Sequence, residues 1–256
     1  MTTPTPSTMV PLEFNPELDI DRLRDEFRKT DRVQIVDFLK EECAQALHKC
    51  LAEDLPWDIS FMEDENVRVA NARAYDNMSP QQKAQILQKV MMTARDDFQF
   101  FYDSYRVDVA LEAGTGDHFY VHRFFEFMNS KPLLDFMRMV TGMTTMDNAD
   151  AHATRYRPGS FLTEHNDYDV NASRLCAYVM NLTPSWRQDW GGILNFYDDD
   201  NNVIEGFKPR WNTINLLRVP QSHSVSYVPP FAGAHRFSVT GWLRDKSGKN
   251  VNAKIT

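Results

Sequence analysis

The sequence predicts an α+β fold with a mainly β core, in which a helix-rich first part precedes a strand-rich sandwich or barrel. Up to about residue 149, several segments have apolar residues that recur at helical spacing. From about Asp150 onward, short runs of β-branched and aromatic residues alternate with turn residues, without a helical pattern between them. Many short strands at regular intervals are typical of a sandwich or barrel. An immunoglobulin-like sandwich is the alternative, but it leaves the placement of the polar residues unexplained.

These patterns divide the chain into four parts. Residues 1–18, rich in Thr and Pro at their start, are expected to form a flexible tail without the basic and apolar regions of a signal peptide. Residues 19–149 should form a mainly helical part with a few strands, packed on the core. Residues 150–245 should form the β core, and residues 246–256 a second tail.

Three helix starts can be predicted in the first part. Asp19 is a suitable cap for a short helix, and Ser79-Pro80 combines a capping serine with a proline in the first turn. The second of these helices is expected to run to about Tyr105. It should bury four apolar side chains, Ile86, Val90, Phe98 and Phe101. Ser130 should cap a further helix that stops near Gly142.

Two other segments of the first part have different patterns. Residues 33–39 have the composition of a strand, and the residues after them place Ala44 and Leu47 on one helical face. Residues 57–75 carry the acidic run 63–65. They form either a mobile lid over the barrel mouth or a solvated acidic loop.

The composition disfavours nucleic acid and membrane partners. The chain has 28 Lys+Arg against 36 Asp+Glu, so it lacks the positive field that nucleic-acid binding needs. Its longest apolar stretches, such as residues 175–182, are far shorter than the roughly 20 residues of a membrane span. Three cysteines without a metal-binding spacing favour reduced thiols and a cytoplasmic location.

The segment FLTEHND contains the only His-x-Asp of the chain, formed by His165 and Asp167. In an extended segment, residues two apart project to the same face, so these two side chains could bind one ion together. A His-x-Asp often occurs by chance, and any histidine can be an ordinary surface or core residue. The pair is therefore weak evidence without a third ligand.

His223 supplies a candidate third ligand, 58 residues after His165 (223 − 165), at the start of the run HSVSYV. Two histidines and one carboxylate bind non-haem Fe(II) on one octahedral face and leave three positions open. We therefore expect His165, Asp167 and His223 to hold a metal. His152 and His235 are the competing third ligands.

Arg236 and Ser238 follow His223 in a further strand-like run. On a strand they face the same way, whereas Phe237 packs on the opposite side. A guanidinium and a hydroxyl on one inward face form a socket for a carboxylate, because arginine binds carboxylates bidentately and stays charged. The alternative is a surface arginine paired with a nearby acid.

Together, the H-x-D, the distant H and the R-x-S resemble the Fe(II)/2-oxoglutarate-dependent dioxygenases of the prolyl 4-hydroxylase-like branch. The resemblance covers roughly residues 150–245, and RYRPGSFLTEH, AYVMNL, DWGGILNF and RFSVTGW are similar to further segments of that family. The pattern W-x-x-D-W-G-G looks most like the hydroxylases that act on a ribosomal protein. Those enzymes carry a second, non-catalytic barrel, whereas one barrel is expected here. Val179 stands where some prolyl hydroxylases have a tyrosine that contacts 2-oxoglutarate.

The resemblance implies a double-stranded β-helix, which is a jelly-roll or cupin-like fold, with the N-terminal helical layer packed on one sheet. It implies Fe(II), 2-oxoglutarate and O2, with ascorbate as a reductant, and the release of succinate and CO2. It places 2-oxoglutarate against Arg236, Ser238 and Tyr156, and it places Trp242 near the substrate. Because Asp167 is present, the resemblance implies hydroxylation and not halogenation.

The expected substrate is a prolyl residue of a peptide or protein, and the alternative is a free amino acid or another small molecule. Two interpretations come from other classes of protein. A His2Asp zinc hydrolase would use the same ligands but would not need the Arg236 and Ser238 socket. A silent barrel that only binds would usually have lost a metal ligand, whereas all three are present.

Overall fold

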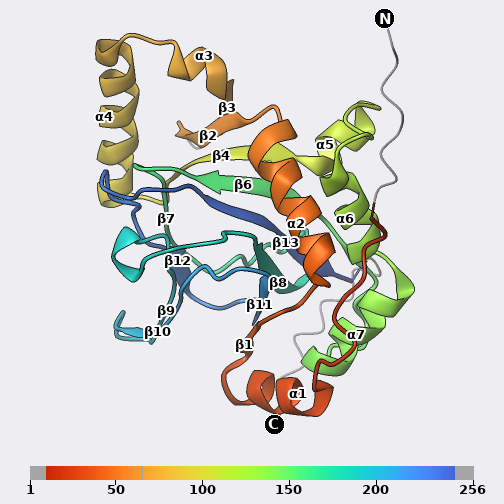
Figure 1. Ribbon diagram of the computed structural model, residues 1–256. Coiled ribbons are helices and arrows are strands. Elements are labelled where there is room, and N and C mark those ends of the chain that lie inside the picture. Colours follow the sequence, from red (N-terminus) through yellow and green to blue (C-terminus); the bar gives the residue numbers. More distant parts are fainter. Residues whose placement is uncertain (1–9, 65, 246–256) are drawn as a thin grey trace, which may run out of the picture.

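The computed structural model describes residues 10–64 and 66–245, arranged as a curled sheet with helices on its outside (Figure 1). The described residues form one sheet of thirteen strands. These are β1 (Arg32–Ile35), β2 (Asp58–Glu63), β3 (Asn66–Asn71), β4 (Phe100–Arg106), β5 (Asn148–Ala149), β6 (His152–Tyr156), β7 (Phe161–His165), β8 (Arg174–Asn181), β9 (Leu194–Tyr197), β10 (Val203–Phe207), β11 (Thr213–Arg218), β12 (His223–Val225) and β13 (Arg236–Arg244).

The strand order divides the sheet into two layers that curl into a barrel. Strands β1, β11, β8, β13 and β6 follow one another in one layer, and β7, β12, β9 and β10 in the other. Strand β4 pairs with both β6 and β7 and so connects the layers. All the pairings are antiparallel, so residues of one face alternate with residues of the other along each strand.

Most of the helices lie against the layer that contains β8 and β13 (Figure 1). The helices of the described residues are α1 (Ile20–Thr30), α2 (Glu41–Lys49) continued by the π-helix η1 (Cys50–Asp54), α3 (Ala72–Asp76), α4 (Pro80–Asp96), α5 (Val107–Glu112), α6 (Tyr120–Met128), α7 (Lys131–Thr141) and the 3-10 turn η2 (Gln188–Trp190). The largest buried cluster joins helical residues such as Phe27, Leu47 and Phe124 to Met180 and Val239 of the sheet. The helical layer therefore packs on the outer face of β8 and β13.

The three predicted helix starts are confirmed. The Asp19 side chain accepts a hydrogen bond from the backbone N–H of Arg22 at the start of α1. Ser79 forms a capping box at the start of α4, and Ser130 caps α7. Helix α7 ends at Gly142, whose left-handed conformation suits glycine.

The predicted extent of two elements is wrong. Helix α4 ends at Asp96 and not near Tyr105, because the aromatic residues that follow belong to β4. Phe101 is buried from that strand, whereas Phe98 is 43% exposed. The strand expected at residues 33–39 is the shorter β1. In both places the structure depends on pairing with strands that are distant in the sequence. Local sequence patterns contain no information about these partners.

Residues 57–64 and 66–75 form the hairpin β2–β3 and helix α3, so the segment as a whole is not a loop, although Asp64 of the acidic run is exposed at the hairpin turn. Strand β2 pairs with β4, so the hairpin extends the sheet and leaves β3 at its edge. Glu65 of the acidic run lies outside the described residues. The lid function stays a prediction.

Part of the expected N-terminal tail is packed on the protein. Val10, Leu12, Phe14 and Leu18 lie against the large cluster between the helices and the sheet. The remainder of that tail, residues 1–9, and the predicted C-terminal tail lie outside the described residues.

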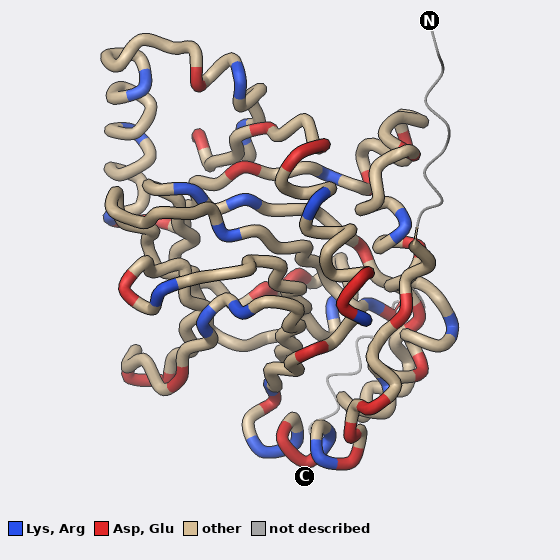
Figure 2. The backbone as a smooth tube through the Cα atoms, viewed as in Figure 1, with Lys and Arg blue, Asp and Glu red and all other residues tan. Residues whose placement is uncertain are grey.

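Charged residues of both signs are intermixed along the described backbone, as Figure 2 shows. Within the described ranges, every helix is too short or too polar to cross a lipid bilayer.

Candidate metal and cosubstrate site

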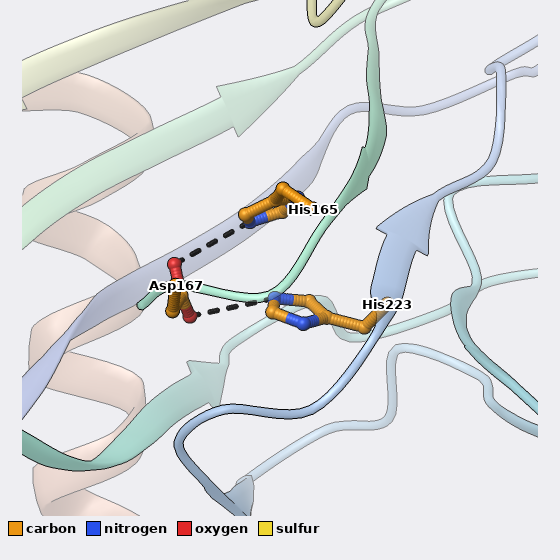
Figure 3. A group of neighbouring side chains, drawn as sticks. All are labelled: His165, Asp167 and His223. Carbon is orange, nitrogen blue, oxygen red and sulfur yellow. Dashed lines mark ion pairs between the residues drawn. The ribbon is translucent and has the colours of Figure 1, made fainter. Parts of the chain in front are cut away.

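The two histidines of the predicted metal site lie opposite each other on neighbouring strands (Figure 3). His165 is the last residue of β7 and His223 the first residue of β12. The two strands pair antiparallel with His165 directly opposite His223, and the ring centroids are 4.2 Å apart. Opposite residues of an antiparallel pair project to the same face, which explains how ligands 58 positions apart (223 − 165) meet.

Asp167 reaches this pair by a different route from the predicted one. It lies beyond the end of β7, and its φ of 62° is left-handed, so the segment is not extended there. This bend turns the carboxylate back towards both imidazoles. Asp167 Oδ1 is 3.4 Å from His165 Nε2, and Oδ2 is 3.5 Å from His223 Nε2. The expected proximity is present, but the predicted strand geometry behind it is wrong.

In each histidine, a hydrogen bond at Nδ1 fixes the tautomer of the ring and leaves Nε2, the nitrogen that faces Asp167, without a hydrogen. The Nδ1 atoms of His165 and His223 lie 3.0 and 2.7 Å from the backbone oxygens of Thr163 and Gln221. A carbonyl oxygen only accepts, so each Nδ1 carries the hydrogen and donates it. In the neutral rings both Nε2 lone pairs then point at the carboxylate.

The pKa values of the cluster favour a neutral imidazole and an ionised carboxylate. Burial lowers the pKa of His223 to about 4. Burial raises the pKa of Asp167, but at low pH, where the imidazoles are protonated, a hydrogen bond from His165 and the positive charge of His223 outweigh burial and lower the value to about 2. One ligand atom from each of the three residues lies within 4.8 Å of the others. Two imidazole nitrogens and one carboxylate oxygen that converge without a hydrogen between them fit a divalent first-row transition metal.

The two competing histidines do not join this cluster. His152 lies on β6 next to the Trp242 ring, at 6.0 Å between centroids. His235 precedes β13 and lies next to the Phe237 ring on the opposite face of that strand. Among the described residues, the group with metal-binding geometry consists of His165, Asp167 and His223.

Arg236 is a buried cation on the inner face of β13, with 1% of its surface exposed. It lies opposite Tyr156 of β6, and its guanidinium carbon is 5.0 Å from the centre of that ring. The guanidinium donates to the backbone oxygen of Gly192 at 2.8 Å and to Asn181 Oδ1 at 3.4 Å. Its Nε has no hydrogen-bond partner among the described residues.

The carboxylate socket is tested by what surrounds this guanidinium. Within the described ranges Arg236 forms no ion pair, so the interpretation as a surface arginine paired with an acid is wrong. A buried charge without a counterion is costly, and a bound carboxylate would remove that cost. Ser238 also faces inward, where its hydroxyl shares a 2.7 Å hydrogen bond with Thr154. The residues present therefore fit the far carboxylate of 2-oxoglutarate.

A row of aromatic rings links the arginine to the metal cluster, and the sequence analysis missed its central member, Tyr102. The Tyr102 ring stacks on Tyr156 at 5.1 Å and on Phe100 at 5.0 Å. Phe98 continues the row and lies 5.4 Å from the His165 ring. The alternation F-x-F-x-Y at residues 98–102 could have indicated these residues, because residues two apart share one face of a strand.

Comparisons with known proteins agree with this geometry. Residues 151–244 match the model of the 2OG-Fe(II) oxygenase superfamily. The prolyl 3-hydroxylase OGFOD1 of Mus musculus is 31% identical over 111 residues, which are 41% of this chain and 20% of the mouse protein. The Xenopus laevis protein of the same name is 30% identical over 119 residues, which are 43% of this chain and 23% of that protein. The match therefore spans only about a fifth of the length of these relatives.

Two solved structures share the fold over most of both chains. A Pseudomonas putida prolyl-4-hydroxylase has a TM-score of 0.55 at 17% identity and covers 89% of this chain and 100% of its own. A Trichoplax adhaerens prolyl hydroxylase was solved with a peptide fragment of hypoxia inducible factor. It has a TM-score of 0.61 at 14% identity, and the match covers 92% of this chain and 93% of the Trichoplax chain. The predicted double-stranded β-helix is confirmed, and the match of residues 151–244 is to the predicted oxygenase family.

Proposed function

We propose that this chain, a 2-oxoglutarate-dependent oxygenase of the prolyl hydroxylase-like type, hydroxylates a prolyl residue of a peptide or protein. One observation carries the cofactor chemistry: a three-residue group with metal-binding geometry and a buried arginine, which has no acidic partner among the described residues, lie on the inner faces of the same barrel. Fe(II), 2-oxoglutarate and O2 follow from the family, and we add ascorbate as a reductant and the cytoplasm as the location.

The roles of the residues follow from their contacts. His165, Asp167 and His223 would hold Fe(II), and the bound ion would supply the chemistry by which O2 converts 2-oxoglutarate to succinate and CO2 and hydroxylates a C–H bond. The Nδ1 hydrogen bonds fix both rings so that Nε2 faces the metal. Arg236 and Ser238 would bind the far carboxylate, and Tyr156 would hold it from the side. The aromatic row excludes water from the space between.

A prolyl substrate is supported by the two relatives, which are named prolyl 3-hydroxylases and match this chain over about a fifth of their length. Loaded with Fe(II) and 2-oxoglutarate, the protein is expected to add one oxygen mass to proline in a synthetic peptide library and to release succinate in equal amount. Mass spectrometry of the library, run in parallel with free amino acids, measures this. If free amino acids stimulate succinate formation and proline peptides do not, the peptidyl-prolyl assignment is wrong.

An exposed apolar surface next to the metal cluster supports a polypeptide substrate. Ser60 of β2 lies opposite Tyr102 of β4 on one side and opposite Val69 of β3 on the other, so the three side chains share one face of the sheet. Val67 lies on the same face, because it is two residues from Val69. Val67 and Val69 are 57% and 54% exposed. We call Val67, Val69 and Phe98 the apolar shelf: Phe98 lies 5.4 Å from the His165 ring, and the two valines lie on the edge strand β3.

The size of the apolar shelf suits several residues of an extended peptide. From β7 to β3 the sheet spans three strand spacings, about 14 Å, and an extended chain covers this with about four residues. A free amino acid is too short to reach from the metal to β3. We therefore expect the enzyme to select apolar residues about four positions from the target proline.

Replacing both Val67 and Val69 by serine is expected to remove this selection. Each half-exposed valine would contribute about 1 kcal/mol on burial, so KM for the preferred library peptide should rise about 30-fold. Consumption of 2-oxoglutarate without peptide should not change. The matched control is Val203→Ser with Ile204→Ser on β10, a pair that is equally exposed on the other edge of the sheet. Equal KM values for the two double variants would contradict the role of the apolar shelf.

A further inference from the structure

The metal ligand Asp167 sits in a backbone conformation that needs outside support. Its left-handed φ of 62° costs an aspartate of the order of 1 kcal/mol relative to an ordinary conformation. The residues between β7 and β8 leave the sheet, and Tyr168, the next residue, is 54% exposed. A carboxylate at the edge of such a segment keeps its direction only if neighbouring groups hold the chain behind it.

Arg174, the first residue of β8, makes the contact that holds this backbone. Its guanidinium donates from Nη1 to the backbone oxygen of Asp167 at 3.0 Å. A second terminal nitrogen lies 3.8 Å from the Asp169 carboxylate, further along the same segment. Arg174 therefore binds the connection between β7 and β8 at Asp167, the residue with the left-handed backbone.

Trp242 holds Arg174 in turn. The guanidinium carbon of Arg174 lies 3.7 Å from the centre of the Trp242 ring, which is a close cation–π contact. Among the described residues, the indole N–H of Trp242 has no hydrogen-bond partner. Asp150 anchors the other side of Trp242, because its carboxylate accepts the Trp242 backbone N–H at 2.6 Å and binds Arg244.

We propose that Arg174 is a positioning residue that acts through Asp167: stacked on Trp242, it fixes the carbonyl of Asp167 and so aims the carboxylate at the metal. This inference rests on the metal centre proposed above. It also gives Trp242 a support role behind the metal ligand, in addition to the predicted place near the substrate. Partners that orient metal ligands typically contribute about 10- to 100-fold to metal affinity.

The test is the affinity of the metal-free protein for Mn(II) alone, measured by titration calorimetry. Arg174→Met keeps the apolar stem and removes the donor, and it is expected to weaken Mn(II) binding about 10- to 100-fold. Arg174→Lys should recover only part of the loss, because an ammonium does not stack and donate at once. Trp242→Phe keeps a ring under the guanidinium and should weaken binding less than Arg174→Met.

The matched control is Arg218→Met. Arg218 ends the neighbouring strand β11, donates to Asp31 at 2.7 Å and lies over the Phe27 ring at 5.8 Å, away from the metal cluster. It should lose a similar amount of thermal stability and keep wild-type Mn(II) affinity.

The outcomes separate this inference from the proposed function. If the wild-type protein binds no Mn(II), the metal centre itself is wrong and the inference falls with it. If the wild type binds Mn(II) and Arg174→Met and Arg174→Lys bind it equally well, the metal centre stands and the positioning role is wrong. Unchanged metal affinity combined with a raised KM for a peptide would instead make Arg174 a substrate contact. Should Arg174→Met fail to fold, Arg174→Lys and Trp242→Phe decide the question by the same measurement.

Discussion

Replacing His223 by alanine is expected to abolish iron-dependent turnover, and His165→Ala and Asp167→Ala are expected to do the same. Each change removes one of only three protein ligands from a cluster whose atoms lie within 4.8 Å of one another. Loss of a partner behind a ligand already costs about 10- to 100-fold, so loss of the ligand itself should exceed about 100-fold in metal affinity. Succinate release and bound iron, measured on the same samples, report the effect.

The half-buried His152 supplies the control for this experiment. It lies on the inner face of β6, and burial lowers the pKa of its imidazole to about 4, as for His223, but it is not part of the metal-binding group. His152→Ala should therefore keep iron.

The metal-free His223→Ala protein should unfold at the wild-type temperature or above, because three converging electron-pair donors no longer repel one another. Retained turnover in His223→Ala together with lost turnover in His152→Ala would identify His152 as the third ligand.

Replacing Arg236 should affect the cosubstrate and not the metal. A desolvated, charge-assisted hydrogen-bonded pair contributes about 1.5–3 kcal/mol, so Arg236→Ala should weaken 2-oxoglutarate binding about 10- to 150-fold. Arg236→Lys should recover part of this, since a point charge replaces a planar fork. The dependence of succinate release on 2-oxoglutarate concentration measures the change.

The unfolding temperature of a third variant, Arg236→Met, measured without ligand, shows whether Arg236 serves to bind 2-oxoglutarate or to stabilise the fold. In the ligand-free protein Arg236 is a buried charge without an acidic partner, so Arg236→Met should unfold at a higher temperature while losing affinity for 2-oxoglutarate. Arg32 is the matched control, because it is also buried but already pairs with Glu205 at 2.5 Å. Arg32→Met should lower stability and leave 2-oxoglutarate binding unchanged. A wild-type 2-oxoglutarate dependence in Arg236→Ala would rule out the carboxylate socket.

The elements that follow from local chemistry were predictable from the sequence. The caps Asp19, Ser79 and Ser130 start helices because their side chains satisfy free backbone N–H groups within the same turn. The strand-rich runs after residue 150 have the alternation of half-buried strands, and they form β6 to β13. In these places neighbouring residues alone contain the required information.

The elements that depend on distant partners were not predictable in the same way. Residues 98–102 continue the apolar spacing of α4, yet from Phe100 onward the chain forms β4, because this strand pairs with β2, β6 and β7. For the same reason Tyr102, which stacks on Tyr156, escaped the sequence analysis. A local pattern does not report which strands lie on either side.

The candidate metal ligands lie together as expected, but partly through a different geometry from the predicted one. His165 and His223 meet because their strands pair, which the strand order and the family resemblance indicated. Asp167 meets them through a left-handed bend and not through extended alternation. The contacts of Arg174 and Trp242 behind it join three separate segments, so they emerge only from the fold.

The most direct test of the central claim is an anaerobic titration of the protein with Fe(II) and 2-oxoglutarate, followed by visible absorption. An Fe(II) centre that binds 2-oxoglutarate through its keto acid group gives a metal-to-ligand charge-transfer band. We predict a saturable band in the wild-type protein, its absence in His223→Ala, and a shift to higher 2-oxoglutarate concentration in Arg236→Ala. A wild-type protein that binds a divalent metal but develops no band with 2-oxoglutarate would contradict the claim and favour the zinc hydrolase or the silent barrel.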